Sequence, residues 1–375
     1  MKVAVFTGPT GGHFFPALAF CEALKVQNPN TQILFVTSLR AYDLVEKAKE
    51  RVTADFQYLP DFPLPRANRA DFLIRIGPFL IKLAQSFSKT KKILSQFMPD
   101  ITVGFGSYIS FPGLWISRQT NIPTLIHEQN WKMGKANHGL ARRATRVALS
   151  FDPGKVSLPQ KFQVTGLPLR TSLVESAQKK KRREPAVFPD NQFRILIVGG
   201  SQGAHSLNQL WRDALERFSH EEKSKLAVIH ITGKMDFESV KTMYLSKQIN
   251  ALVFPFHEHM EEVYPEADLA VTRAGAGTLF ELAAFGLPAV VVPYPHAEGH
   301  QEHNARYFKN AGAVHVIHQS DSPSLLKDTV LEITNSKNLK DQMSQSSNRL
   351  AVLDAGNRLA KLCEEMVTTQ EACSL

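Results

Sequence analysis

Cysteine is scarce in this sequence, and its three copies follow no pairing pattern. Cys21, Cys363 and Cys373 are scattered through 375 residues, without the spacing of a disulfide framework or of a zinc site. Long apolar runs are missing too. None approaches the length that crosses a bilayer, and the amino terminus lacks the long apolar segment of a signal peptide. We therefore expect a globular protein of the reducing cytoplasm, whose cysteines serve packing.

Three signatures of nucleotide chemistry are also absent. No glycine-rich turn continues into Gly-Lys-Ser or Gly-Lys-Thr, so the chain has no P-loop, and none has the G-x-G-x-x-G pattern of dinucleotide-binding proteins. There is no Asp-x-Asp pair, which a metal-dependent sugar transferase would use to hold Mg²⁺ or Mn²⁺. A diphosphate would then be neutralised by backbone amides, hydroxyls and a cationic side chain. We expect neither a metal nor another cofactor.

Acidic residues are outnumbered by basic ones, 35 against 44, which gives a formal net charge of +9. The basic residues are grouped in 66–92, in 132–146 and in the run KKKRRE at 179–184. No helix-turn-helix, zinc finger or aromatic RNA-binding motif accompanies them, so we do not expect a nucleic-acid partner. An anionic membrane surface suits this charge better.

Short apolar runs alternate with helical patterns along the chain, in two successive arrays. Runs that are apolar on both faces are typical of strands in a parallel sheet covered by helices. The first array is KVAVFT, QILFVT, DITVGFG, TLIHEQ, RVALS and FQVTG, and the second is FRILIVGG, LAVIHITG, ALVFPF, LAVTRAG, AVVVPYP and AVHVI. The pattern predicts an α/β protein with two doubly wound, Rossmann-like domains that face a cleft.

The same alternation sets the expected domain limits. It predicts an N-terminal domain over residues 1–168, a linker over 169–191 and a C-terminal domain over 192–350. A last helix, over 351–370, is expected to pack back on the first domain. The first helix of the chain is expected to open near Pro16, because proline suits an initial helical turn.

Three glycine-rich turns follow apolar runs: GPTGGH at 8–13, GGSQGAHSLN at 199–208 and RAGAGTLFE at 273–281. Glycine lets the backbone approach a ligand closely, and the helix that opens after such a turn offers free N–H groups and a positive dipole end to phosphate. One such turn is a weak signal, because tight turns also use glycine for packing. Three of them, in two arrays, favour a nucleotide site.

The ordered motifs GPTGGHFFP, IHEQN, TGLPLR, GGSQGA, TRAGAGTLFELAAFGLPAVVVPYP and HQEHNA resemble those of the MurG family, from Lys2 to about Ile317. Members of that family transfer N-acetylglucosamine from UDP-GlcNAc to lipid-linked N-acetylmuramoyl-pentapeptide, which makes lipid II from lipid I in peptidoglycan synthesis. The resemblance implies a GT-B fold, with the acceptor on the N-terminal domain and UDP-GlcNAc mainly on the C-terminal one. The chain departs from the family pattern at Pro9, Leu167, Glu298 and His300.

The resemblance also implies a set of substrate-binding residues. They are Thr10, Gly11, Gly12, Asn130 and Arg170 in the first part of the chain, and Ser201, His257, Ala276, Gly277, Thr278, Leu279, Phe280, Glu281 and Gln301 in the second. Thr10 and Ser201 would bind phosphate, and the backbone of His257 would meet uracil. Glu281 would accept hydrogen bonds from the ribose hydroxyls, and Gln301 would meet the hydroxyls of the sugar.

His13, His127 and Glu128 are the candidates for the catalytic base. An imidazole that titrates near neutrality can take the proton of an attacking hydroxyl, and His13 directly follows two glycines. The plainer alternatives are that His13 pads the first helix, that His127 and Glu128 form a hydrogen-bonded strand end, and that Glu281 faces solvent on its helix.

A run of histidines, HAEGHQEH, looks superficially like a metal site. His296, His300 and His303 have a spacing that would place them near one helical face. Gly299 interrupts that helix, however, and no three-ligand zinc motif is present, so we do not expect a zinc site.

The segment FLIRIGPFLIKLAQSF, residues 72–87, combines apolar and basic residues. It suits an apolar patch, with Ile76 and Phe79 among its members, that dips into an anionic leaflet within a ring of arginine and lysine. The alternative is an ordinary amphipathic helix buried in the first domain. Docking at the cytoplasmic face of the bacterial cell membrane would suit an enzyme with a lipid-linked acceptor.

The resemblance implies an inverting UDP-GlcNAc-dependent glycosyltransferase, and the missing Asp-x-Asp pair favours one that is independent of metal. Its partners would be UDP-GlcNAc, undecaprenyl-linked N-acetylmuramoyl-pentapeptide and an anionic membrane surface. Three alternatives stay open: another UDP-sugar transferase with a lipid acceptor, a UDP-sugar epimerase, and a non-catalytic UDP-sugar sensor.

Overall fold

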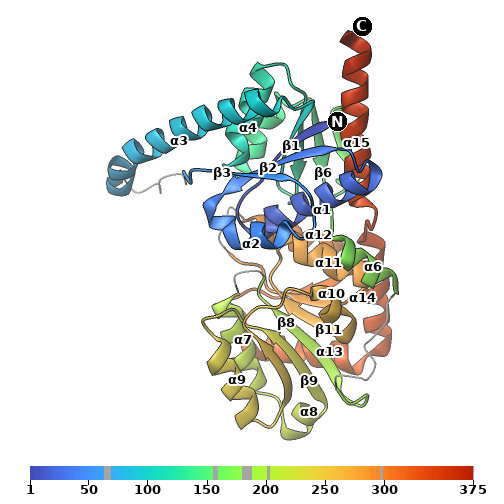
Figure 1. Ribbon diagram of the computed structural model, residues 1–375. Helices are drawn as coiled ribbons and strands as arrows, with labels where there is room; N and C mark the ends of the chain where they lie inside the picture. The colour runs from blue at the N-terminus through green and yellow to red at the C-terminus, as the bar shows by residue number, and fades with distance from the viewer. Residues whose placement is uncertain (63–68, 155–158, 180–187, 201–202, 296–298, 375) are drawn as a thin grey trace. The chain divides into compact units, whose positions relative to one another are not determined.

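The protein consists of two compact units (Figure 1). The computed structural model describes residues 1–62, 69–154, 159–179, 188–200, 203–295 and 299–374. The first unit combines Met1–Thr171 with Asp354–Leu375, and the second is Ser172–Leu353. The first unit is therefore built from two separate segments of the chain.

A parallel seven-stranded sheet forms the centre of the first unit. Its spatial order is β3-β2-β1-β4-β5-β6-β7. The strands are β1 (Lys2–Phe6), β2 (Gln32–Ser38), β3 (Asp55–Leu59), β4 (Ile101–Gly104), β5 (Thr124–Glu128), β6 (Arg146–Leu149) and β7 (Phe162–Val164). The apolar runs predicted all of these except β3. Its sequence, DFQYL, lies at the sheet edge and is buried only in part, so it lacks the continuous apolar pattern.

Helices accompany this sheet along the chain. They are α1 (Gly11–Gln27), η1 (Leu39–Ala41), α2 (Tyr42–Ala48), α3 (Arg69–Phe97), α4 (Ser110–Gln119), α5 (Lys135–Ala141) and α15 (Ala355–Ser374). None of the helices in the described ranges is long and apolar enough to cross a membrane.

Helix α1 begins earlier than Pro16 suggested. Thr10 has the extended conformation of an N-cap, and its carbonyl accepts from His13 N at 3.0 Å and Phe14 N at 2.9 Å, so the helix opens at Gly11. Pro16 lies inside the helix, where it removes one backbone donor. The expectation of a start near Pro16 was wrong, and the consequence is that His13 belongs to the first helical turn.

The apolar patch expected in 72–87 is divided between the two sides of α3. Phe79 packs against the core, with its ring centroid 6.3 Å from that of Phe62, so it was wrongly assigned to the outer surface. Leu80 and Ile81 are the exposed apolar residues, 53% and 61% accessible. A helix turns by about 100° per residue, so neighbours in sequence face different surroundings.

The second unit is built on a parallel six-stranded sheet with the order β10-β9-β8-β11-β12-β13. The strands are β8 (Phe193–Val198), β9 (Leu226–Ile231), β10 (Asn250–Phe254), β11 (Leu269–Thr272), β12 (Ala289–Val291) and β13 (Val314–Val316). The predicted pair of doubly wound α/β folds is thus confirmed.

Helices pack around this second sheet as well. They are α6 (Thr171–Lys179), α7 (His205–Leu215), α8 (His220–Ser224), α9 (Phe237–Ser246), α10 (Met260–Val263), η2 (Tyr264–Glu266), α11 (Ala276–Phe285), α12 (His300–Asn310), α13 (Pro323–Asn335) and α14 (Lys337–Leu350). Residues 171–179, expected within a linker, form α6.

In each sheet the strand order reverses once at the centre. The chain leaves β1 toward β2 on one side and reaches β4 on the other, and β8 lies in the same way between β9 and β11. Connections that diverge at the carboxyl ends of two neighbouring strands leave room for a ligand, which makes these points the usual binding sites of such folds. The three glycine-rich turns follow β1, β8 and β11.

Helix α15 completes the core of the first unit (Figure 1). Leu359 and Cys363 are fully buried in the same apolar cluster as Phe20 and Cys21 of α1. Burial raises the pKa of both thiols, so they remain protonated and behave as small apolar groups.

We predict that Leu359→Ala destabilises the first unit. Removing a fully buried leucine side chain loses its transfer free energy and leaves a cavity, which together cost about 2–5 kcal/mol. Denaturant unfolding checks this value. Lys361→Ala is the matched control on the same helix, because the Lys361 side chain is 75% exposed. Equal stability of Leu359→Ala and wild type would contradict the packing role of α15.

Candidate functional site

His13 lies at the strand-order reversal of the first unit, between the turns that follow β1 and β4. A Cβ atom added to Gly8 would stand 3.1 Å from the His13 ring, and one added to Gly106 would stand 3.2 Å from it. Gly106 also has φ +75°, a conformation that glycine adopts without strain. These two glycines therefore create the space that the imidazole occupies.

A backbone carbonyl fixes the tautomer of His13. The Nδ1 atom lies 2.8 Å from Phe105 O. A carbonyl oxygen can only accept, so Nδ1 carries the proton and donates it, and Nε2 becomes the basic atom of the ring. A neutral imidazole held in this way has the orientation that a general base requires.

His127, at the end of β5, is fully buried and has both ring nitrogens engaged. Its Nε2 lies 3.1 Å from Gly166 O, and its Nδ1 lies 3.4 Å from Gln129 Nε2. The pKa of His127 is lowered to about 4, mainly by burial and to a smaller extent by the nearby His13, while the bond to Gly166 O opposes the shift. This neutral, enclosed ring suits a structural role better than proton transfer.

The Glu128 carboxylate organises the loop that follows β5. One oxygen accepts from Asn130 N at 2.9 Å and Asn130 Nδ2 at 3.3 Å, and the other accepts from Gly134 N at 3.0 Å and Asn137 Nδ2 at 2.8 Å. With four donors and only 2% exposure, the carboxylate is fully used in holding the loop. Of the three proposed bases, His13 therefore has the geometry closest to that role.

The remaining first-unit residues of the expected site differ in accessibility. Thr10 is half-buried, with no capping bond from its side chain, and Gly12 is exposed with open space around its Cα. The amides of Gly11 and Gly12 are among the first four of α1, which have no partner within a helix. Arg170 is buried, with its guanidinium 4.9 Å from the centre of the Phe15 ring.

In the second unit, the turn after β8 packs closely against the turn after β9. A Cβ on Gly203, whose φ is +73°, would stand 2.7 Å from Gly233 Cα, so only glycine fits there. Helix α7 begins directly afterwards, with Ala204 as an N-cap that supplies no side-chain bond. The amides of a first helical turn, with the positive end of the helix dipole, favour an anion. The expected phosphate ligand Ser201 lies outside the described residues.

Arg273, the residue that follows β11, is a buried cation held by neutral acceptors. It donates to Val292 O at 3.0 Å, Pro293 O at 3.4 Å, Ser206 Oγ at 2.5 Å and Gln319 Oε1 at 2.9 Å. In the described part of the chain no carboxylate pairs with it. Burial lowers the pKa of Arg273 from its ordinary value, but arginine stays protonated. The carboxyl edge of this sheet therefore carries positive charge.

Gln301 and Asn304 of α12 hold the turn before α11. Gln301 Oε1 accepts from Ala274 N at 3.1 Å and from Tyr294 N at 2.9 Å, and Asn304 Nδ2 donates to Ala274 O at 3.2 Å. The oxygen of the Gln301 amide is thus occupied by the backbone. Its Nε2 is the group of this side chain that is suited to donate to a ligand oxygen.

The residues expected to line the nucleotide on α11 fall into two groups. Leu279 and Phe280 are buried, and Phe280 packs edge-on against Phe308, so their side chains belong to the core of the unit. Gly277, Thr278 and Glu281 are half-buried on the helix, and Ala276 is buried. Glu281 Oε2 accepts from Tyr264 OH at 2.6 Å.

His257 lies in the connection between β10 and α10 and is half-buried. Its ring centroid is 4.9 Å from that of Phe254, and its Nε2 is 4.0 Å from Glu262 Oε2. The backbone contact expected for His257 is not tested by these interactions. Of the histidine run, His296 lies outside the described residues, and within the described ranges no group of three metal-ligating side chains comes together.

Four residues that organise these sites were missed by the sequence analysis. They are Gln129, Asn137, Arg273 and Asn304, whose side chains donate hydrogen bonds to backbone carbonyls or to other side chains. Three of them lie in the motifs IHEQN, RAGAG and HQEHNA, and Asn137 follows IHEQN by seven residues. A polar residue that directly follows a buried strand is the signal that could have identified Gln129 and Arg273.

Comparison with known proteins agrees with this arrangement. The model of the glycosyltransferase family 28 N-terminal domain matches residues 3–149, and that of the glycosyltransferase family 28 C-terminal domain matches residues 194–359. Curated relatives named UDP-N-acetylglucosamine--N-acetylmuramyl-(pentapeptide) pyrophosphoryl-undecaprenol N-acetylglucosamine transferase include one from Halothermothrix orenii, 34% identical over 97% of this chain and 99% of its own. Another, from Desulfotalea psychrophila, is 33% identical over 99% of this chain and 98% of its own.

The solved structure of Acinetobacter baumannii MurG matches with a TM-score of 0.74 at 29% identity, over 97% of this chain and 99% of that one. The two Rossmann-like units have the GT-B fold, and the two family models assign the chain to the glycosyltransferases. The chain belongs to glycosyltransferase family 28, among the MurG proteins. The predicted resemblance is confirmed.

The epimerase alternative shares this fold. The UDP-GlcNAc 2-epimerase from Neisseria meningitidis, solved with UDP-GlcNAc bound, matches with a TM-score of 0.68 over 97% of this chain and all of that one. Its sequence identity is only 15%, so the likeness concerns the fold alone.

We predict that His127 makes the first unit sensitive to acid. The pKa of His127 is about 4 in the folded protein and about 6.5 when unfolded, so below pH 6.5 the unfolded chain binds a proton that the folded one excludes. The free energy of unfolding should fall by about 3 kcal/mol between pH 7 and pH 4 from this group. Thermal unfolding as a function of pH measures it.

His127→Gln should flatten this dependence, because an amide keeps a donor for Gly166 O but does not titrate. The matched control is His138→Gln, which changes an exposed histidine of the same unit and should leave the dependence unchanged. If the stability of His127→Gln and that of wild type depend on pH in the same way, His127 is not the source of the acid sensitivity.

Proposed function

We propose that this protein transfers N-acetylglucosamine from UDP-GlcNAc to the 4-hydroxyl of lipid-linked N-acetylmuramoyl-pentapeptide, with inversion at the anomeric carbon. The observation that carries the proposal is His13, whose Nδ1 donates to Phe105 O in the first turn of α1. The names of the curated relatives and of the Acinetobacter baumannii structure support the choice of substrates.

The reaction is a single displacement. The acceptor hydroxyl attacks the anomeric carbon of GlcNAc as the bond to UDP breaks. His13 Nε2 takes the hydroxyl proton, and the diphosphate carries away the electron pair of the broken bond. The transition state has oxocarbenium character, so stabilising the departing diphosphate lowers the barrier.

The second unit supplies the groups that suit a nucleoside diphosphate. The amides at the start of α7 and the positive charge of Arg273 favour the phosphates. Glu281 accepts from ribose hydroxyls, and the Nε2 of Gln301 donates to a hydroxyl oxygen of the sugar. Because the sequence offers no Asp-x-Asp pair, we propose that the diphosphate is bound without a metal.

We further propose that α3 docks the enzyme on the cytoplasmic face of the cell membrane. Its amino-terminal end projects away from the sheet of the first unit (Figure 1). Leu80 and Ile81 are exposed on it, next to the exposed Lys82 and ahead of Lys89. Apolar side chains that enter a leaflet beside lysines that attract anionic headgroups are typical of peripheral binding.

Turnover with defined substrates tests the function. Purified protein given UDP-GlcNAc and a lipid I analogue should release UDP and form the disaccharide product, and saturating EDTA should leave the rate unchanged. Isomerisation of UDP-GlcNAc without acceptor would identify an epimerase. Binding without turnover would identify a sensor, and transfer to another lipid acceptor alone would identify a different transferase.

We predict that His13→Ala lowers kcat by about 10²–10⁴-fold, the usual contribution of a general base. Affinity for UDP-GlcNAc, measured by calorimetry, should change little, because the base acts on the acceptor. His220→Ala is the control, since it removes an exposed histidine of α8 in the second unit and should leave kcat unchanged. Near-normal turnover of a folded His13→Ala enzyme would assign the base elsewhere.

We predict that Leu80→Ser combined with Ile81→Ser weakens membrane binding. Wild type should bind vesicles rich in anionic lipid at low salt and be partly released as salt screens the attraction. The double variant should lose the binding that survives high salt. Leu325→Ser, at an exposed leucine of α13, is the matched control. Equal binding to neutral and anionic vesicles, or normal binding by the double variant, would contradict docking through α3.

A further inference from the structure

Tyr264 connects the buried part of the second unit to Glu281. It is the first residue of η2, is 2% exposed, and directs its hydroxyl at the Glu281 carboxylate of α11. The distance from Tyr264 Oη to Glu281 Oε2 is 2.6 Å, as in charge-assisted O–H···O⁻ hydrogen bonds, which are stronger than neutral ones. The phenol donates and the carboxylate accepts.

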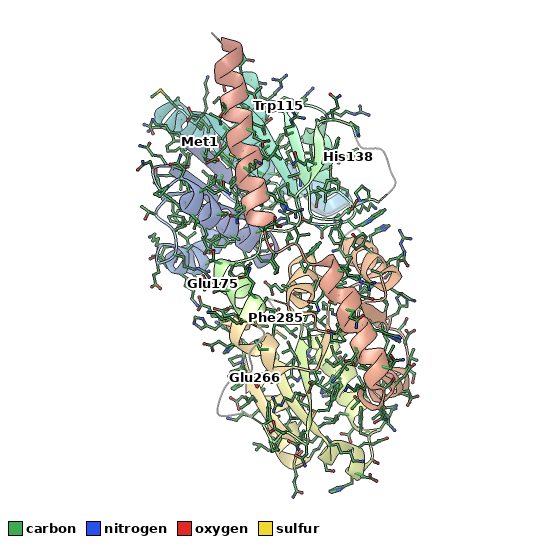
Figure 2. All side chains as sticks on the ribbon, turned by 90° about the vertical axis from the view of Figure 1, so that its right-hand side faces the viewer. Met1, Trp115, His138, Glu175, Glu266 and Phe285 are labelled. Carbon is green, nitrogen blue, oxygen red and sulfur yellow. The ribbon has the colours of Figure 1, made fainter. Side chains whose placement is uncertain are left out.

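The Tyr264 ring contacts α11 through an aromatic pair. It packs against Phe285, the last residue of that helix, with ring centroids 5.2 Å apart. Figure 2 labels Phe285. It also lines a surface cavity of about 200 Å³ together with Pro288 and Lys340. With 2% of its surface exposed and Phe285 against its ring, Tyr264 presents its hydroxyl to Glu281 from a buried position.

A fixed donor changes what Glu281 can do. A glutamate on a helix surface has several rotatable bonds, and ordering it on ligand binding costs conformational entropy. A carboxylate accepts at about four lone-pair sites, so one oxygen can bond to Tyr264 while the group also receives ribose hydroxyls. A hydroxyl that already holds the carboxylate removes part of the ordering cost before the nucleotide arrives.

We propose that Tyr264 is a positioning residue that fixes the Glu281 carboxylate for the ribose hydroxyls of the UDP-sugar. The proposal rests on the proposed function, because it takes Glu281 as the ribose-binding group. Tyr264 itself need not touch the nucleotide.

The test compares UDP with 2′-deoxy-UDP, which lacks one ribose hydroxyl. Calorimetry on the full-length protein should show that Tyr264→Phe weakens UDP binding about threefold to tenfold, the size of one hydrogen bond's net effect. Binding of 2′-deoxy-UDP should weaken clearly less. In turnover, KM for UDP-GlcNAc should rise while kcat stays within about twofold, since ground and transition states lose the same contact.

A double variant supplies the second arm. Glu281→Ala should weaken UDP binding about tenfold or more, and adding Tyr264→Phe to it should have no further effect, because the hydroxyl acts only through the carboxylate. The matched control is Tyr244→Phe, at another buried tyrosine of this unit, whose hydroxyl bonds to Trp211 and His230. It should lower the unfolding temperature without changing the ratio of the two affinities.

The outcomes separate this inference from the proposed function. If Tyr264→Phe leaves both affinities unchanged, or lowers both by the same factor, Tyr264 is not a positioning residue. If Tyr264→Phe weakens UDP binding relative to wild type as expected, but wild type transfers no sugar, the transferase function fails and the positioning role stands. If wild type binds no UDP, both are overturned.

Discussion

The reversal of strand order at the centre of each sheet is the constraint on which both sites depend. Neighbouring strands there send their connections to opposite faces, so their carboxyl ends are not covered by a crossing loop. In the first unit this opening holds His13 between two glycines, and in the second it holds Arg273 beside the start of α7. The chemistry of each site is set by the few side chains that enter this opening.

The two openings differ in the charge of the side chains that line them. His13 is bonded to a backbone carbonyl and lies near His127, whose pKa is lowered by burial so that its ring is neutral at pH 7. Arg273 keeps its full charge among carbonyl, hydroxyl and amide oxygens, so its field is not cancelled locally by those partners. The charge at one opening can thus change by substitution without altering the other.

The sequence predicted the architecture well because buried parallel strands leave a strong local signal. It failed where the signal is not local. The strand over 55–59 is only half covered, and Phe79 and Leu80 differ in facing although both are apolar. The partners of Arg273 lie in three other connections of the sheet, so the charge could be read from the sequence but not its setting. Similarly, the resemblance indicated Gln301. Only the fold shows that its amide oxygen already accepts a hydrogen bond from the Ala274 amide.

The discontinuous makeup of the first unit has a consequence for synthesis on the ribosome. Its core includes Leu359 and Met366 of α15, which are translated after the whole of the second unit. The second unit, Ser172–Leu353, is uninterrupted and can close before them. Domains usually fold in the order in which they emerge, amino-terminal first. Here the unit whose translation starts first is completed last, and until then part of its apolar surface on α1 stays uncovered and accessible to chaperones.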